Sequence, residues 1–172
     1  LDGISFEIPK GQAVGLIGRN GCGKSSLLKL LIGQPIAHTG TLEIGSRLTV
    51  SYVPQDMSFL SGSADDFAAE SEIDITLFKT ILRKLDFKRT QFTKDMSEFS
   101  MGQKKKVLLA RSLCQRANLY IWDEPLNYID VISRLQIETL ILEYKPTMLF
   151  VEHDEAFVND IATKVCRISL NQ

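Results

Sequence analysis

The sequence has few cysteines, no long hydrophobic run and no excess charge of either sign. Cys22, Cys114 and Cys166 are odd in number, widely separated and not in Cys-x-x-Cys spacing. We therefore expect reduced and mostly buried thiols instead of disulfides or metal sites. The longest apolar runs, such as residues 107–110, are far shorter than the ~18 residues that a membrane-spanning helix needs. A formal net charge of -1 gives no electrostatic sign of a nucleic-acid or membrane partner.

The N-terminus shows no signal-peptide pattern, and no repeat or low-complexity segment is visible. We therefore expect a cytoplasmic protein without direct membrane insertion. A length of 172 residues fits a single domain, residues 1–172, with a sizeable core and room for a small inserted lobe. Ile4, Phe6 and Ile8 already alternate with polar residues, so we expect a half-buried first strand and a fragment of a longer chain.

One stretch organises the rest of the chain. The apolar run at residues 13–17 leads into Gly-Arg-Asn-Gly-Cys-Gly-Lys-Ser at residues 18–25, and an apolar helix pattern follows at residues 27–32. This is the phosphate-binding pattern in the strand-to-helix context that it needs. The nucleotide-binding residues predicted from it are Gly18, Arg19, Asn20, Gly21, Cys22, Gly23, Lys24, Ser25 and Ser26.

The residue types of this loop suit a phosphate. Glycine permits positive φ angles and close approach to an anion, so Gly18, Gly21 and Gly23 are expected to gather backbone N–H groups around it. The helix that starts near Gly23 adds the positive end of its dipole. Lys24 can reach the β- and γ-phosphates, and the Ser25 hydroxyl is the expected Mg²⁺ ligand. The sequence therefore predicts a nucleotide site.

Strands alternate with helices through the remaining sequence. The Gly45-Ser46 pair between residues 41–44 and 48–53 predicts an antiparallel hairpin. Further strands are predicted at 119–122, 147–151 and 164–170, and a helix is predicted to begin near Asp130, which can cap it. This alternation predicts an α/β fold with a mainly parallel core sheet and a small antiparallel β patch.

Residues 60–116 show no strand pattern and are predicted to form an inserted helical subdomain. Apolar residues fall at helical spacing over 77–85 and 107–113. The acidic residues between 65 and 74 and the basic run Lys104–Lys106 are interpreted as solvated faces, with a partner-binding patch as the alternative.

Asp123 and Glu124 directly follow the apolar residues 119–122. A carboxylate at the end of a buried strand can hold Mg²⁺ opposite Ser25, and its neighbour can polarise an attacking water. The alternative is a strand end with two solvated acids. Because the pair lies downstream of a phosphate loop, we favour the catalytic interpretation.

These residues resemble the motifs of the ATP-binding cassette (ABC) ATPases, and the resemblance covers essentially the whole chain. Residues 18–25 match the Walker A loop and residues 119–124 the Walker B strand, with Gln55 at the place of the Q-loop glutamine and His153 at that of the switch histidine. The resemblance implies a P-loop NTPase fold and an ATPase that uses ATP and Mg²⁺. Its implied catalytic residues are Glu124, His153 and Gln55, and its implied metal ligands are Ser25, Gln55 and Asp123.

Two further segments carry the resemblance. Phe99–Gln103 stands in place of the Leu-Ser-Gly-Gly-Gln signature, and Leu126–Asp130 resembles the D-loop, with Asn127 and Asp130 as its polar residues. The resemblance implies that two cassettes, in one chain or in a homodimer, meet head to tail around each ATP. The signature residues that would serve the ATP of the partner are Ser100, Met101, Gly102 and Gln103.

This sequence departs from the family pattern in two ways. Met101 replaces the first signature glycine and adds bulk where a backbone approaches phosphate. The aromatic residue on which the family stacks adenine lies upstream of Walker A, and we expect it before Leu1. Because no residue here clearly replaces that aromatic residue, we expect weak or poorly base-selective ATP binding by this domain alone. Because the signature must come from a partner cassette, we also expect very low hydrolysis by the monomer.

The D-loop, Met101 and the switch segment at residues 151–157 are most similar to the second cassette of bacterial ABC-F proteins of the antibiotic-resistance type. That resemblance implies a cytoplasmic protein that binds the ribosome and uses ATP to drive or release the binding. One alternative is the nucleotide-binding subunit of a membrane transporter, with a membrane subunit as partner. Another is a cassette that binds ATP as a switch and hydrolyses it slowly, against which Glu124 argues.

Overall fold

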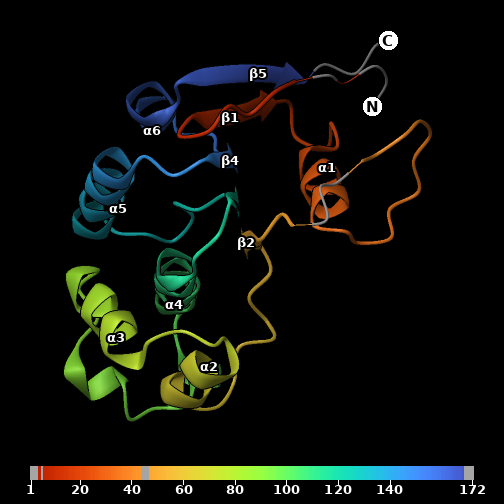
Figure 1. The fold of residues 1–172 in the computed structure, drawn as a ribbon. Coiled ribbons are helices and arrows are strands. Elements are labelled where there is room, and N and C mark those ends of the chain that lie inside the picture. The colour runs from red at the N-terminus through yellow and green to blue at the C-terminus, as the bar shows by residue number, and fades with distance from the viewer. Residues whose placement is uncertain (1–3, 5, 44–46, 169–172) are drawn as a thin grey trace. The chain divides into compact units, whose positions relative to one another are not determined.

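The computed structural model describes residues 4, 6–43 and 47–168. The chain divides into two compact units (Figure 1). The first comprises residues 1–52, 117–124 and 145–172, and the second comprises residues 53–116 and 125–144. The first unit carries the β-sheet, and the second is helical.

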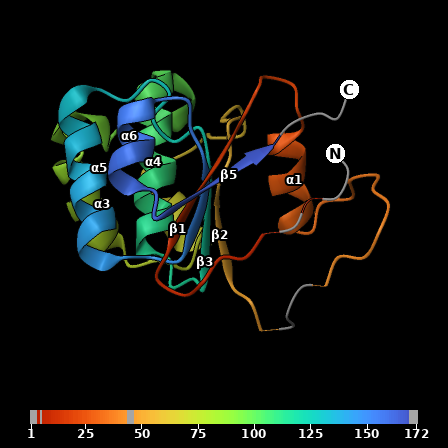
Figure 2. The same ribbon diagram turned by 90° about the horizontal axis from the view of Figure 1, so that it is seen from above.

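The sheet has five strands in the order β2-β3-β4-β1-β5. Strand β1 pairs in parallel with β4 and β5, and β3 pairs in parallel with β4. Helices α1 and α6 of the same unit lie on opposite faces of this sheet (Figure 2). The bounds are β1 Ala13–Gly18, α1 Lys24–Leu31, β2 Val50–Val53, β3 Leu119–Asp123, β4 Met148–Val151, α6 Glu155–Ile161 and β5 Lys164–Ile168. The mainly parallel sheet with flanking helices confirms the predicted α/β fold.

The core of the first unit explains why these strands are almost continuously apolar. A parallel sheet covered by helices is buried on both faces, so strand residues of either face lie in the interior. Every residue of β4 is buried. The buried cluster in which α1 meets the sheet consists of Val14, Leu16, Cys22, Leu28, Ile121, Leu149, Val151 and Ile168.

The second unit is built from helices that begin at polar capping residues. Ser63, Asp74 and Ser100 each accept a hydrogen bond from a backbone N–H in the first turn of α2, α3 and α4. Asp130 does the same for α5, as the sequence predicts, because its Oδ1 accepts from Ser133 N at 2.9 Å. The bounds are α2 Ala64–Glu70, α3 Ile75–Lys84, α4 Met101–Cys114 and α5 Val131–Tyr144, with short 3-10 helices at Arg89–Gln91 and Met96–Glu98.

The structure differs from the sequence prediction at the expected first strand and at the expected antiparallel patch. Ile4, Phe6 and Ile8 are not in a strand and pack, half-buried, against the core cluster. Residues 41–43 are likewise outside any strand, and the expected Gly45-Ser46 turn lies outside the described residues. A two-stranded hairpin is marginal without further strands to pack on. Only the end of the second expected strand forms, as β2.

The interpretation of the basic run as a solvated face is wrong. Lys105 is fully buried and Lys106 is 8% exposed, although both lie on helix α4 among charged neighbours in the sequence. Their ammonium groups are satisfied inside the second unit: Lys105 Nζ donates to Pro54 O at 3.2 Å, and Lys106 Nζ lies 2.6 Å from Asp130 Oδ2. A lysine is buried only when such partners compensate its charge.

All three cysteines are free, with Cys22 buried and the other two half-buried, as the sequence predicts. Burial raises the pKa of the Cys114 thiol to about 11, and the nearby charge of Asp74 adds to the increase. Such a thiol is unreactive at neutral pH. Within the described part of the chain, no helix is long and apolar enough to cross a membrane.

Candidate functional site

The predicted site residues of the first unit gather at one edge of the sheet. Strands β1, β3 and β4 are parallel neighbours, so their carboxyl ends share an edge. The phosphate loop follows β1, Asp123 ends β3 beside Val151 of β4, and His153 comes two residues later. In open parallel sheets, ligands bind at the carboxyl ends of the strands. The topology therefore brings residues 18–25, 123–124 and 153 to the position where a ligand is expected.

The phosphate loop adopts the conformation that its glycines permit. Gly21 has φ 77°, and Gly23, which precedes α1, has φ 93°. Both values lie in the left-handed region that side chains rarely adopt. Cys22 N closes a turn of the loop by donating to Arg19 O at 3.2 Å, and α1 adds the positive end of its dipole where the loop ends.

Gly18 is needed for a different reason from the one predicted, because its φ is not positive. A Cβ at this position would lie 2.6 Å from the Ile168 carbonyl oxygen and 2.8 Å from Cys22 Sγ. Ile168 belongs to β5, which pairs with β1 at this point. The absent side chain therefore lets the first loop residue fit between a neighbouring strand and the buried cysteine.

Lys24 places a positive charge inside the loop. It is only 7% exposed, and its Nζ donates to the carbonyls of Gly18 (2.8 Å) and Arg19 (3.0 Å). No described carboxylate forms an ion pair with it. A buried ammonium held by neutral carbonyls, next to a helix N-terminus, fits an anionic ligand such as a phosphate chain.

Asp123 is the most buried acid of this edge, with 1% of its surface exposed. Burial and the negative charge of Asp123 together raise the pKa of Tyr52 to about 12. Among the described residues, no group of three or more His, Cys, Asp or Glu side chains could hold a metal alone. Mg²⁺ characteristically takes one or two protein ligands and completes its shell with phosphate oxygens and water. Two protein ligands, such as Ser25 and Asp123, are therefore enough for a Mg²⁺ site, and a closed cage of protein ligands is not needed.

Glu124 and His153 meet at the same edge. Glu124 Oε1 lies 3.5 Å from His153 Nε2. Glu124 has φ 50°, a left-handed conformation that is unfavourable for a residue with a side chain, and its N–H is held by Val151 O at 2.9 Å. Backbone strain of this kind is found where function over-determines the geometry. The strained backbone of Glu124 thus coincides with the place where its carboxylate meets the histidine.

Sequence reasoning missed Glu152. This residue is 5% exposed, and its Oε1 accepts hydrogen bonds from the backbone N–H groups of His153 (2.7 Å) and Asp154 (3.3 Å). Asp154 in turn caps α6 by accepting from Phe157 N at 2.9 Å. The turn that carries His153 is thus held by two carboxylates. An acid directly after a fully apolar strand was the available signal for this role.

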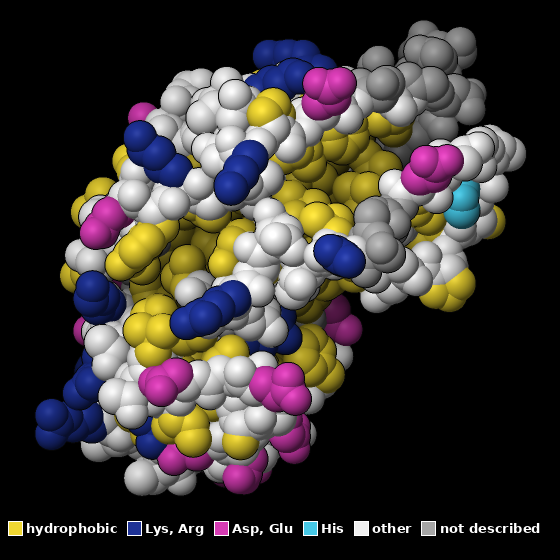
Figure 3. Space-filling view, viewed as in Figure 1, with side chains coloured by type: hydrophobic (Ala, Val, Ile, Leu, Met, Phe, Trp, Pro, Cys, Tyr) yellow, Lys and Arg dark blue, Asp and Glu magenta, His cyan; other side chains and the backbone are white. Residues whose placement is uncertain are grey.

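A cavity of about 910 Å³ lies beside the phosphate loop in the first unit. Its lining combines apolar side chains of residues 4–8, α1 and residues 36–42 with the loop at Gly21–Gly23. Figure 3 shows hydrophobic side chains recessed in hollows on the face drawn. The cavity is therefore lined by the backbone of the phosphate loop on one part and by apolar side chains on the rest.

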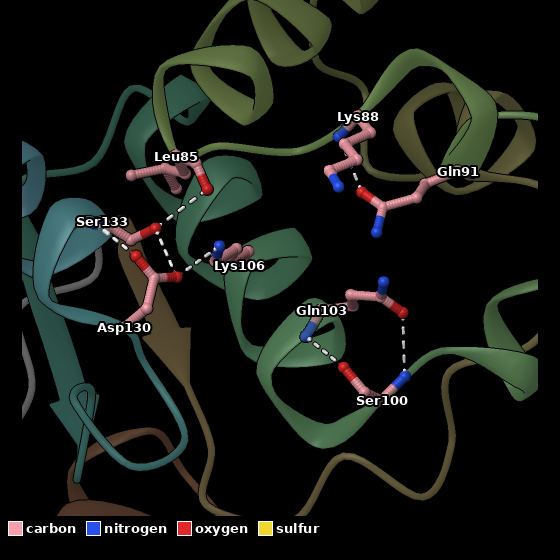
Figure 4. A network of polar contacts seen from close by, with 8 residues as sticks. All are labelled: Leu85, Lys88, Gln91, Ser100, Gln103, Lys106, Asp130 and Ser133. Atoms are coloured by element: carbon pink, nitrogen blue, oxygen red, sulfur yellow. Dashed lines mark hydrogen bonds and ion pairs between the residues drawn. The ribbon is translucent and has the colours of Figure 1, made fainter.

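The remaining predicted site residues lie in the second unit. Gln55 is exposed and follows Pro54, whose carbonyl holds Lys105. The signature segment forms a capping box: Gln103 N donates to Ser100 Oγ (3.2 Å) and Ser100 N donates to Gln103 Oε1 (2.9 Å; Figure 4). Ser100 Oγ thus serves as an acceptor, and its hydroxyl hydrogen remains able to donate to an anion.

Gln103 is therefore engaged in capping its own helix, and Met101 points outward with 45% of its surface exposed. In the D-loop segment, Asn127 is half-buried and Asp130 both caps α5 and pairs with Lys106. Signature and D-loop thus lie in one unit, whereas the phosphate loop, Glu124 and His153 lie in the other.

Residues 1–127 match the sequence profile of a protein family described as ABC transporter. The match covers well over half of the 172 residues and decides the family. The chain belongs to the ABC transporter family. It is an ATP-binding domain of that family, here called the cassette.

Two curated relatives align with nearly all of the cassette. The ATP-binding protein YdiF of Bacillus subtilis is 35% identical over 176 residues, which cover 98% of the cassette and 27% of YdiF. The energy-dependent translational throttle protein EttA of Escherichia coli is 30% identical over 173 residues, covering 96% of the cassette and 31% of EttA. The cassette thus spans less than a third of these relatives. They confirm the predicted resemblance to the ABC-F proteins.

A solved structure is also similar. The cassette superposes with a TM-score of 0.78 and 27% identity on an archaeal ribosome recycling factor, crystallised with a ribosomal stalk protein. The superposition covers 93% of the cassette and 32% of that chain. The fold predicted from the strand and helix order is therefore that of known cassettes.

Proposed function

We propose that the cassette binds MgATP at residues 18–26 and hydrolyses it as one half of a head-to-tail pair of cassettes. The observation that carries the proposal is the Glu124–His153 pair, 3.5 Å apart, at the edge of the sheet that also holds the buried Lys24. An acid beside a histidine and next to a phosphate cradle suits activation of water for attack on a γ-phosphate.

Each residue has a distinct task in this proposal. The loop N–H groups and Lys24 hold the phosphates. They also stabilise the negative charge that develops on the phosphate oxygens in the transition state. Ser25 and Asp123, with Gln55 as a further ligand, would hold Mg²⁺, which would supply positive charge to neutralise the phosphates. Glu124 accepts the proton of the attacking water, and His153 donates to a γ-phosphate oxygen. Positioning and charge stabilisation supply the rate, with no covalent intermediate on the protein.

The second unit is proposed to serve the ATP of the other cassette. Ser100 can donate its hydroxyl hydrogen, and α4 directs the N-terminal end of its dipole to the same place. In this proposal residues 1–172 act as one nucleotide-binding domain, with residues 60–116 as its helical subdomain. The second cassette lies in the same chain or in a homodimer.

We further propose that the complete protein is a cytoplasmic ABC-F protein that acts on the ribosome in translation or antibiotic resistance. EttA is named as a translational throttle protein, and the superposed archaeal chain is a ribosome recycling factor. The second candidate is the nucleotide-binding subunit of a membrane transporter, which the description of the matched family favours.

The test uses the full-length protein carrying Glu124→Gln, which removes the proton acceptor while keeping the shape of the side chain. With ATP, the variant should hydrolyse at least about 100-fold more slowly and remain with ribosomes during sedimentation. Glu70→Gln, an exposed change at the end of α2, is the matched control and should behave as wild type. Retention with membranes instead of ribosomes would support the transporter, and unchanged hydrolysis would remove Glu124 from the mechanism.

A further inference from the structure

One side of helix α4 is attached to the D-loop, residues 126–130. Gly102 and Lys106 are separated by four positions on α4 and therefore lie on the same face of the helix. Each of them meets the D-loop within the second unit. Figure 4 shows Lys106 reaching Asp130 from α4, one turn beyond the capping box of Ser100 and Gln103.

The first attachment is a contact between backbones. A Cβ added to Gly102 would lie 2.6 Å from the carbonyl oxygen of Tyr128. Tyr128 itself has φ 67°, a left-handed conformation that its side chain makes unfavourable. The loop is therefore held in a strained form directly against α4, and any residue larger than glycine at position 102 would push it away.

The second attachment is an ion pair. Lys106 Nζ lies 2.6 Å from Asp130 Oδ2, and the side chain of Lys106 is only 10% exposed. Asp130 also accepts from Ser133 N and Ser133 Oγ, both at 2.9 Å. The single hydroxyl hydrogen of Ser133 is shared between that carboxylate and Leu85 O, also at 2.9 Å, at the end of α3. The pair thus joins α4, the D-loop, the start of α5 and the end of α3.

The charge state of Asp130 suits this arrangement. Burial raises the pKa of its carboxyl, but hydrogen bonds from Lys106 and Ser133 outweigh that effect and lower the pKa to about 2. Asp130 is thus a carboxylate at neutral pH. A mostly buried ammonium whose partner is removed is left uncompensated, so neither member of the pair can be replaced without consequence for the other.

We propose that Lys106 is a positioning residue: through Asp130, and together with the close contact at Gly102, it locks the D-loop to the signature helix. The two elements then act as one rigid block, so the loop takes up a defined position whenever the signature engages the ATP of the second cassette. Gly102 accordingly has a role inside its own cassette besides any approach to phosphate. The expected effect on ATP hydrolysis rests on the proposed function. The attachment of the D-loop to α4 does not depend on it.

Lys106→Met in the full-length protein tests the lock, because methionine keeps the length of the aliphatic stem and removes the charge. Lys104→Met is the matched control, since Lys104 lies on the same helix and its side chain makes no hydrogen bond or ion pair with the described residues. The first measurement is hydrogen exchange of peptides that cover residues 126–130. We expect exchange to accelerate about tenfold in Lys106→Met and to stay unchanged in Lys104→Met. Lys106→Arg, which can pair with Asp130, should restore the slow exchange.

The second measurement is steady-state ATP hydrolysis by the same variants. A loosened block should lower kcat about tenfold in Lys106→Met while the ATP affinity of the phosphate loop stays within about twofold, because Lys24 and its neighbours are untouched. Lys106→Arg should recover most of the turnover. Asp130→Asn should resemble Lys106→Met, and the double variant should be no slower than either single variant, since both remove one interaction.

The outcomes separate the lock from the proposed function. Equal exchange at residues 126–130 in Lys106→Met and Lys104→Met would overturn the lock whatever the ATPase result. Faster exchange with rescue by arginine, in a wild-type protein that does not hydrolyse ATP, would support the lock and count against the proposed function. Faster exchange spread evenly over the whole second unit, without rescue by arginine, would show a general loss of stability and overturn the positioning role.

Discussion

Lys24 offers a prediction in which stability and ligand binding change by very different amounts. Lys24 is 7% exposed, and its ammonium donates to two neutral carbonyls, those of Gly18 and Arg19. Lys24→Met removes two charge-assisted hydrogen bonds, each of about 1.5–3 kcal/mol, but also removes the cost of burying an ion, which is several kcal/mol. Because Arg19 is exposed and Gly18 is only half-buried, we expect water to replace the lost donor at these carbonyls.

The two effects oppose each other, so we expect the free energy of unfolding without nucleotide to change by less than about 1 kcal/mol. Binding has no such compensation. Loss of a charge-assisted bond to phosphate should weaken ATP affinity about 10- to 150-fold. The loss of function would therefore occur in a protein that is as well folded as the wild type.

Calorimetry on the full-length protein measures both quantities. Without nucleotide, the Tm of Lys24→Met should stay within about 3 °C of wild type, and titration with MgATP should show the weaker binding. Lys29→Met, an exposed lysine of the same helix, is the matched control and should alter neither. The reasoning is refuted if Lys24→Met lowers stability by more than about 2 kcal/mol or binds ATP as tightly as Lys29→Met.

Two further predictions concern packing and pH. Gly18→Ala places a Cβ 2.6 Å from the Ile168 carbonyl oxygen, and this overpacking should destabilise the protein by about 1–3 kcal/mol in urea unfolding; adding Cys22→Ala should restore little, because the backbone clash with β5 remains. The pKa of Asp130 is lowered from its ordinary 3.8 to about 2 in the folded protein, so the unfolded chain takes up a proton first as the pH falls. The free energy of unfolding should therefore decrease as the pH falls from about 4 to about 2, and urea titrations should show a shallower decrease for Asp130→Asn. An equally steep decrease in that variant would contradict the assignment.

Much of the fold could be predicted from local patterns. Strands β1, β3 and β4 lie within one residue of the expected positions, because buried parallel strands are short apolar runs bounded by polar residues. Caps such as Asp130 were visible because a cap and its helix are adjacent in the sequence. The expected hairpin was not found in the described residues, because a turn signal does not supply the packing that a small antiparallel patch needs.

The candidate site divides in the same way. The phosphate loop was predictable because its glycines, lysine and helix start are contiguous, and the positive φ angles of Gly21 and Gly23 follow from residue type. The reason for Gly18 was not predictable, because Ile168 approaches it from a strand at the other end of the chain. Glu152 was overlooked because its task, holding the turn of His153, depends on the direction in which the chain leaves β4.

The sequence by itself determined which reactive residues this cassette offers: the glycine-rich loop with Lys24, the paired acids after a buried strand, His153 and the helix that follows Ser100. These are properties of short contiguous segments. Only the tertiary structure decided which distant side chains meet, bringing Glu124 to His153 and burying Lys106 against Asp130. The sequence pattern of the lysine run predicts a solvated face, because the residues that pair with Lys105 and Lys106 lie in other segments. Packing decides whether the charge faces water or a carboxylate, and in this cassette it faces the D-loop.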